Sequence, residues 1–203
     1  MELTAKELKE RFPPQFEREY WKWVGNAFHY DWWDGVYDCF VADCEPMGIT
    51  VDPERIYFSL SYSQGDYASF EGRIDMAKWM DHQGYSEKYL ALRLDAEEFG
   101  AYGYIRTGRG SRTYVDLEYY PGQTAPTGVF TDLPQEAWDE LVEEQFKAEE
   151  WEEHMSEQVR SLADDLYRRL QQEYEYLSSE EQFIESCERN DVTFYVDDEE
   201  CEA

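Results

Sequence analysis

Apolar residues recur at helical spacing through the first 44 residues of the chain. Residues 4–12 show this pattern and end at two prolines, which stop a helix. Residues 15–24 favour a second helix, although their WKW alternation is also compatible with a strand at a sheet edge. The spacing is clearest over residues 31–44, where we expect an amphipathic helix that packs on a sheet.

Strand periodicity appears twice in the middle of the chain. Apolar and polar residues alternate over residues 56–72, which predicts a β-hairpin that turns at Ser63-Gln64-Gly65-Asp66. Residues 102–107 and 112–120 flank a second glycine-containing turn and predict a second hairpin. Two short helices are expected between the hairpins, at residues 74–82 and 86–99.

The last third of the chain has the pattern of a long helix. Asp132 and Gln135 form a capping-box pattern, and neither glycine nor a further proline interrupts residues 134–177. This helix is either continuous or broken near Ala148, where its apolar stripe shifts phase. A shorter helix and a final strand complete the pattern, over residues 179–190 and 192–196.

These elements predict an α+β fold. The strands come in antiparallel pairs and do not alternate with helices, so we expect an antiparallel sheet built from two hairpins and the C-terminal strand, packed with helices. The expected organisation is an α+β core over residues 1–130 and an acidic helical module over residues 131–203, which ends in a strand and an acidic tail. We expect the two parts to form one compact unit.

Charge is concentrated in the last third of the chain. Residues 131–203 hold 25 acidic and 5 basic residues, which is −20 of the formal net charge of −29. The 7 Trp, 17 Tyr and 11 Phe argue against a disordered acidic chain, because such chains are poor in aromatics. No apolar run is long enough to span a membrane and the N-terminus has no apolar signal region, so we expect a cytoplasmic protein with reduced cysteines.

No familiar catalytic motif is present. The three histidines lie outside known hydrolase and zinc motifs, and no glycine-rich phosphate loop is found. Asp66 and Glu71 could form a carboxylate pair for acid–base chemistry. The simpler interpretation is that Asp66 caps a turn while Glu71 faces solvent. We therefore expect a protein that is not an enzyme and has no cofactor or metal.

The density of acids along the predicted long helix can be compared with that of phosphates on DNA. Its 14 acids lie on a helix about 66 Å long if it is continuous, or one carboxylate per ~4.7 Å. One DNA strand has a phosphate every ~3.4 Å and the duplex a charge every ~1.7 Å. The helix alone therefore approaches the density of a single strand, and mimicry of a duplex would need a second acidic element.

Several like charges lie four residues apart on this helix, as in Glu149, Glu153 and Glu157. Each such pair destabilises a helix by roughly 0.2–0.5 kcal/mol. This favours a basic partner, while a solvated face that only promotes solubility remains the alternative. The partner-binding residues we expect are Asp139, Glu140, Glu143, Glu144, Glu149, Glu150, Glu152, Glu153, Glu157, Asp164, Asp165, Asp197, Asp198, Glu199 and Glu200.

Residues 30–72 resemble a family of phage- and prophage-encoded proteins labelled "antitoxin of toxin–antitoxin stability system". The resemblance covers about a fifth of the chain and rests on Tyr30, Trp32, Trp33, Tyr37, Ile56, Tyr57, Phe58, Ser59, Ser63, Gln64, Gly65, Asp66, Phe70, Glu71 and Gly72. It implies a phage context, in which small, very acidic proteins often inhibit DNA-binding machinery of the host by mimicking DNA.

Charge and resemblance together lead to one hypothesis. The protein is expected to bind a basic, nucleic-acid-binding surface of a host defence complex, such as a restriction or CRISPR effector, by DNA mimicry. It would bind neither nucleic acid nor membrane, and the sequence leaves open whether it forms a homodimer. One alternative is an antitoxin that neutralises a basic toxin, and a second is an enzyme that uses Asp66 and Glu71.

Overall fold

The computed structural model describes residues 1–61, 65–85, 87–108, 112–119 and 133–196 and confirms the α+β fold. The chain divides into two compact units. Unit 1 comprises residues 1–34 and 170–203, and unit 2 comprises residues 35–169. This division differs from the expected boundary at residue 130, because residues 148–169 pack with the sheet that precedes them in the sequence while the two chain ends pack together.

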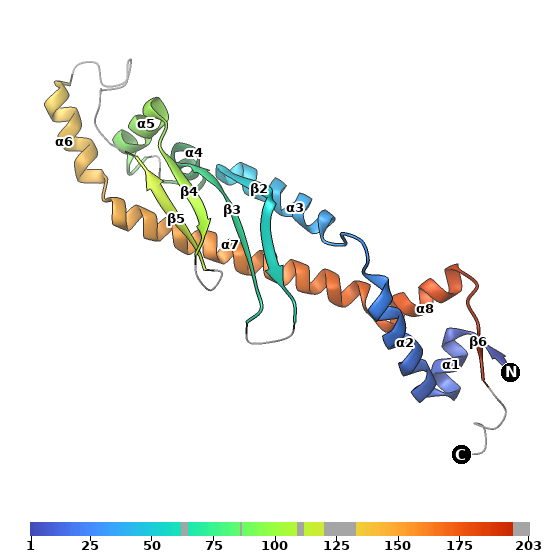
Figure 1. Ribbon diagram of the computed structural model, residues 1–203. Coiled ribbons are helices and arrows are strands. Elements are labelled where there is room, and N and C mark those ends of the chain that lie inside the picture. The colour runs from blue at the N-terminus through green and yellow to red at the C-terminus, as the bar shows by residue number, and fades with distance from the viewer. Residues whose placement is uncertain (62–64, 86, 109–111, 120–132, 197–203) are drawn as a thin grey trace. The chain divides into compact units, whose positions relative to one another are not determined.

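Unit 2 contains a four-stranded antiparallel sheet in the order β2-β3-β4-β5 (Figure 1). The strands are β2 (Ile49–Ser59), β3 (Tyr67–Asp75), β4 (Tyr102–Thr107) and β5 (Thr113–Glu118). Both predicted hairpins are therefore confirmed as strand pairs. Strand β2 begins seven residues before the predicted Ile56, since the pairing is irregular between Val51 and Ile56 and this interrupts the alternation.

Helices pack on one face of this sheet. Helix α3 (Asp34–Cys44) places Phe40 edge-on against Phe70, with ring centroids 5.0 Å apart. Helix α7 (Ala148–Leu177) comes close to the sheet at Gly103, where an added Cβ would lie 3.6 Å from Met155 Sδ of the helix. The buried residues Ile74, Ile105, Val115, Met155 and Val159 belong to this core. The short 3-10 helix η1 (Glu45–Met47) follows α3.

Three further helices complete unit 2. They are α4 (Met76–His82), α5 (Leu90–Phe99) and α6 (Gln135–Gln145). The long helix is broken between α6 and α7, as the shift of its apolar stripe near Ala148 indicated. Phe146 leaves the helical conformation, with φ −106° and ψ 119°, and its ring packs edge-on against Tyr119 at 4.8 Å. Partial burial of this ring against Tyr119 gives a physical reason for the break.

Unit 1 brings the two ends of the chain together. It contains β1 (Glu2–Leu3), α1 (Ala5–Arg11), α2 (Pro13–Ala27), α8 (Glu180–Arg189) and β6 (Phe194–Tyr195). A capping box of Thr4 and Glu7 begins α1, and Ser179 caps α8. Leu8, Phe16, Phe183 and Cys187 form the centre of its core.

The C-terminal strand was expected in the main sheet, and this detail is wrong. Strand β6 pairs antiparallel with β1, so that Leu3 faces Phe194, in a separate sheet of two strands. Alternation of apolar residues identifies a strand but not its partner, and the partner here is the other end of the chain. Ser86, where the expected helix over residues 86–99 begins, the turn residues Ser63 and Gln64, and Asp132 lie outside the described residues. None of the described helices has the length and apolar character needed to cross a membrane.

Candidate functional site

The acids expected to bind a partner fall on α6, on α7 and in the C-terminal tail. Those on α6 are Asp139, Glu140, Glu143 and Glu144, of which the last three are exposed. Those on α7 are Glu149, Glu150, Glu152, Glu153, Glu157, Asp164 and Asp165. Asp197, Asp198, Glu199 and Glu200 lie outside the described residues. All of the expected residues on the two helices belong to unit 2.

Helix α7 separates apolar and acidic residues onto different faces. Within unit 2 its buried positions include Trp151, Met155, Val159, Ala163 and Leu166. They recur every three or four residues, which places them on one side of the helix. Glu149, Glu150, Glu153, Glu157 and Asp164 are exposed, and we call them the acidic stripe. Because the apolar side docks the helix, the acidic stripe is held toward solvent.

Part of the acidic stripe is neutralised within the protein. Lys147 Nζ lies 3.3 Å from Glu150 Oε1, and an Arg160 nitrogen lies 2.6 Å from Glu153 Oε1. These pairs leave the Glu150 and Glu153 side chains 73% and 63% exposed. Within the described ranges, Glu149, Glu157 and Asp164 form no ion pair. Within the acidic stripe, these three carboxylates are therefore the ones most available to an external cation.

Two side chains of α7 accept hydrogen bonds from the strand at the edge of the sheet. The Val115 amide donates to Ser156 Oγ at 2.9 Å, and the Leu117 amide donates to Glu152 Oε1 at 3.1 Å. Strand β5 is the last strand of the sheet, so these amides have no neighbouring strand on that side. Unpaired amides of an edge strand invite pairing with another chain. Glu152, one of the expected partner-binding residues, thus has a role inside the fold.

A second internal carboxylate is buried in unit 2. Asp95 of α5 is fully buried and accepts hydrogen bonds from the Tyr119 hydroxyl and, at 3.4 Å, from Trp138 Nε1. Burial and the hydrogen bond to Asp95 raise the pKa of Tyr119, which keeps its hydroxyl protonated as a donor. Asp95 therefore connects α5, α6 and the segment after β5.

The aspartate and glutamate considered for acid–base chemistry have separate partners. Asp66 accepts hydrogen bonds from the Ser61 hydroxyl at 2.6 Å and the Ser61 amide at 2.8 Å. Glu71 forms an ion pair with Arg55 at 2.7 Å. Asp66 also lines a cleft of about 270 Å³ together with Arg112 and Arg160. These contacts fit the interpretation of Asp66 as a turn residue.

A cleft next to the acidic stripe is lined by aromatic rings. Its volume is about 330 Å³, and Tyr85, Tyr89, Trp151 and His154 line it together with Glu144 and Glu150. Tyr89 and Trp151 lie at 80° with centroids 5.1 Å apart, and Tyr85 and Tyr89 lie at 88° with centroids 6.0 Å apart. A shallower depression of about 370 Å³ shares Glu150 and His154 with this aromatic cleft, and Glu149, Glu153 and Glu157 complete its lining.

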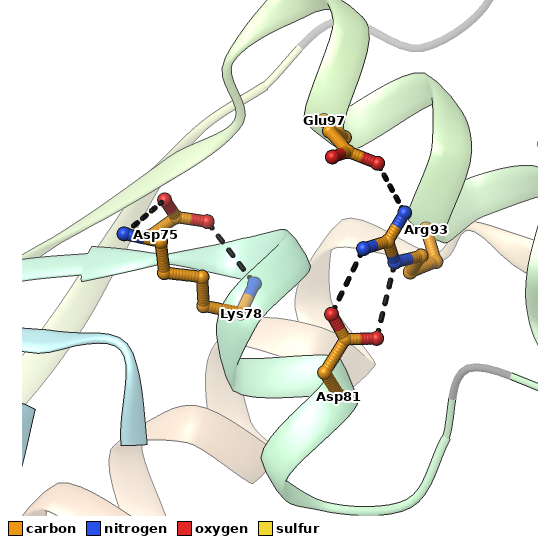
Figure 2. Close-up of polar contacts among 5 residues, drawn as sticks. All are labelled: Asp75, Lys78, Asp81, Arg93 and Glu97. Atoms are coloured by element: carbon orange, nitrogen blue, oxygen red, sulfur yellow. Dashed lines mark hydrogen bonds and ion pairs between the residues drawn. The ribbon is translucent and has the colours of Figure 1, made fainter. Parts of the chain in front are cut away.

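An ion pair joins the two helices on either side of Tyr85 and Tyr89. Arg93 of α5 reaches back to Asp81 of α4 with two hydrogen bonds of 3.1 and 2.9 Å and also contacts Glu97 (Figure 2). At the start of α4, Asp75 accepts the Lys78 amide at 3.1 Å. The forked Arg93–Asp81 pair joins the two helices that flank these tyrosines, and the adjacent carboxylate raises the pKa of Arg93.

The other wall of the aromatic cleft comes from the break between α6 and α7. The Gln145 side chain accepts the Leu92 amide at 3.1 Å, while its backbone carbonyl accepts Trp151 Nε1 at 3.1 Å. The Tyr85 hydroxyl and His154 Nε2 are 2.8 Å apart. Tyr85, Tyr89 and Trp151 were not among the expected site residues, because the rings of the cleft come from segments more than 60 positions apart in the sequence.

Fold and site together define an acidic α+β protein with an aromatic cleft beside an acidic stripe. The chain belongs to a family described as a domain of unknown function, DUF8835, which matches residues 32–180. The match includes all of unit 2 and therefore both surfaces described above. Comparison with curated proteins and with solved structures found no match.

Proposed function

We propose that this protein binds the basic, nucleic-acid-binding surface of another protein, and that carboxylates of α7 occupy positions that phosphates otherwise take. The observation that supports this most is the set of exposed carboxylates at Glu149, Glu157 and Asp164, for which no ion pair is present among the described residues. They project from a helix whose opposite side is buried. Pre-positioned charges of one sign attract and orient a partner of opposite sign.

The spacing of the acidic stripe limits how much nucleic acid it can imitate. From Glu149 to Asp164 the helix rises about 22 Å, so that its five carboxylates average roughly one per 5 Å. A single DNA strand has one phosphate per ~3.4 Å. The exposed acids of α6 add charge, at Glu140, Glu143 and Glu144. This density of carboxylates is sufficient to replace the phosphates of part of one DNA strand on a surface lined by lysine and arginine.

The resemblance of residues 30–72 to phage-encoded proteins guides the choice of partners for testing. Restriction and CRISPR effectors of the host are the first candidates, because their nucleic-acid clefts are basic. The proposal requires competition: bound protein should release DNA from the effector. We expect the effector to release labelled DNA as the protein is added, which a fluorescence-anisotropy titration measures. DNA and the protein should not bind the effector at the same time. A stable ternary complex of effector, DNA and protein would show that the DNA-binding surface is not the target.

A variant provides the matched control for this experiment. Glu149→Gln, Glu157→Gln and Asp164→Asn together remove three charges from the acidic stripe. Glu10→Gln, Glu17→Gln and Glu98→Gln remove the same number from exposed positions elsewhere. We expect the first variant to need at least about ten-fold more protein to release DNA, whereas the second should behave like the unchanged protein.

A further inference from the structure

The aromatic cleft has the geometry of a cation site. Three rings, those of Tyr85, Tyr89 and Trp151, stand at 76° to 88° to one another, with centroids 5.1 to 6.1 Å apart. Rings arranged in this way present both faces and edges to one volume. The face of an aromatic ring has a negative quadrupole, which attracts an ammonium or guanidinium group within about 6 Å of the centroid.

The protein places one of its own cations at this cleft. Lys88 Nζ lies 4.6 Å from the centroid of the Tyr89 ring. A hydrogen bond to Tyr89 raises the pKa of Lys88 and favours its charged form. Lys88 is exposed, so that it can move away when another cation arrives. The contact shows that the Tyr89 ring is accessible to a positively charged side chain.

Carboxylates line the cleft beside the rings, and Lys147, which also lines it, forms an ion pair with one of them, Glu150. Glu144 and Glu150 line the aromatic cleft itself, and the neighbouring depression adds Glu149, Glu153 and Glu157. A guanidinium is planar, stacks on aromatic rings and forms paired hydrogen bonds with carboxylates. An arginine side chain therefore matches both kinds of group better than a compact ammonium does.

We infer that the aromatic cleft binds an arginine side chain of the partner, which displaces Lys88 from the Tyr89 ring. The assignment of this arginine to a partner protein rests on the proposed function, whereas the preference of the cleft for a guanidinium does not. The cleft would act as a specific pocket beside the acidic stripe, which attracts basic surfaces in general. Its residues Tyr85, Tyr89 and Trp151 are uncharged, so their contribution persists at salt concentrations that screen the stripe.

Small probes test the cleft without any partner. The full chain is titrated with arginine amide, with citrulline amide, which has the same shape but no charge on its side chain, and with lysine amide. Binding is followed by the NMR signal of the Trp151 indole N–H, assigned with Trp151→Phe. We expect arginine amide to bind at least about five-fold more tightly than citrulline amide. Equal affinities for the two would overturn the inference, and tighter binding of lysine amide would overturn the choice of arginine.

Three variants locate the binding. Tyr89→Leu should weaken arginine amide about five-fold or more, Tyr89→Phe should retain it, and Tyr176→Leu, at an exposed tyrosine of unit 1, should leave it unchanged. Lys88→Met should tighten the binding of arginine amide more than Lys147→Met does. Both variants remove one positive charge from the same cleft, but only Lys88→Met removes a cation from the Tyr89 ring. Unchanged affinity in Tyr89→Leu would contradict the site.

The outcomes separate this inference from the proposed function. If arginine amide binds as expected and no nucleic-acid-binding protein is displaced from DNA, the result supports the arginine site and contradicts the proposed function. If effector binding depends on the acidic stripe and is unaffected by Tyr89→Leu, the proposed function stands and the cleft is not part of the interface.

Discussion

Two groups of carboxylates in this protein have the same chemistry and different surroundings. Asp95, Glu152 and Glu7 accept hydrogen bonds from donors of the fold itself. Glu149, Glu157 and Asp164 point to solvent, and in the described parts of the chain they form no ion pair. The first group stabilises the structure, whereas the second adds repulsion between like charges.

The difference shows that net charge alone does not define a binding surface. The acids available to a partner are those that the fold does not use, and only the structure separates the two groups. Glu152 illustrates this, because it lies among the acids of α7 in the sequence and nevertheless accepts the amide of an edge strand. Changes in the first group should therefore affect stability, and changes in the second should affect binding.

The largest effect on stability is expected at Asp95. Asp95→Ala leaves the buried Trp138 indole and the Tyr119 hydroxyl without this acceptor, at a cost of about 3 kcal/mol in the free energy of unfolding. Glu98→Ala, at an exposed position of the same helix, should change it by less than about 0.5 kcal/mol. Urea unfolding followed by circular dichroism measures both. Equal stability of the two variants would show that Asp95 is not part of the structural group.

A smaller loss is expected where α7 covers the edge of β5. Ser156→Ala removes the acceptor of the buried Val115 amide and should cost about 1–2 kcal/mol. Ser161→Ala is the control, because Ser161 is exposed on the same helix. Hydrogen exchange of the Val115 amide should accelerate in the first variant and not in the second. If exchange at Val115 is the same in both, Ser156 does not protect the edge.

The capping box of α1 gives the next effect. Thr4→Ala should lower the stability of unit 1 by about 1 kcal/mol, and Thr4→Ser should retain most of it. Hydrogen bonds from the backbone and side chain of Thr4 lower the pKa of Glu7. The contribution of Glu7 is therefore fully present above the ordinary carboxyl pKa and is lost as pH falls through the lowered value. Thermal unfolding at neutral and acidic pH should show a difference between Thr4→Ala and the unchanged protein that shrinks at acidic pH.

The smallest effect on stability is expected in the acidic stripe. The combined change of Glu149, Glu157 and Asp164 to their amides should leave the free energy of unfolding within about 0.5 kcal/mol of the original, with any change in the stabilising direction. Urea unfolding again provides the measurement. A loss of more than about 1 kcal/mol would mean that these acids belong to the structural group after all.

The sequence predicted much of the fold because its signals are local. The strand pairs of the two hairpins and the break in the long helix each depend on residues close together in the chain. The pairing of β6 with β1 could not be predicted, since alternation does not specify a partner strand. The start of β2 was missed because an irregular pairing interrupts its alternation.

The candidate site was predicted in part. The run of acids on α6 and α7 is visible in the sequence, but which of them face solvent depends on the direction in which the apolar side docks. The aromatic cleft depends on the break at Phe146, which brings Gln145 and Trp151 to the segment of Tyr85 and Tyr89. That break appeared in the sequence only as a shift in the apolar stripe near Ala148.

The central claim is that the acidic stripe is a binding surface. The most direct test is the salt dependence of the dissociation constant for a DNA-binding effector, measured for the unchanged protein and for the two variants that each lack three acids. We predict that removing Glu149, Glu157 and Asp164 weakens binding at low salt and flattens the dependence on salt, while removing Glu10, Glu17 and Glu98 does neither. Binding that is indifferent to salt, or that responds equally to both sets of changes, would contradict the claim.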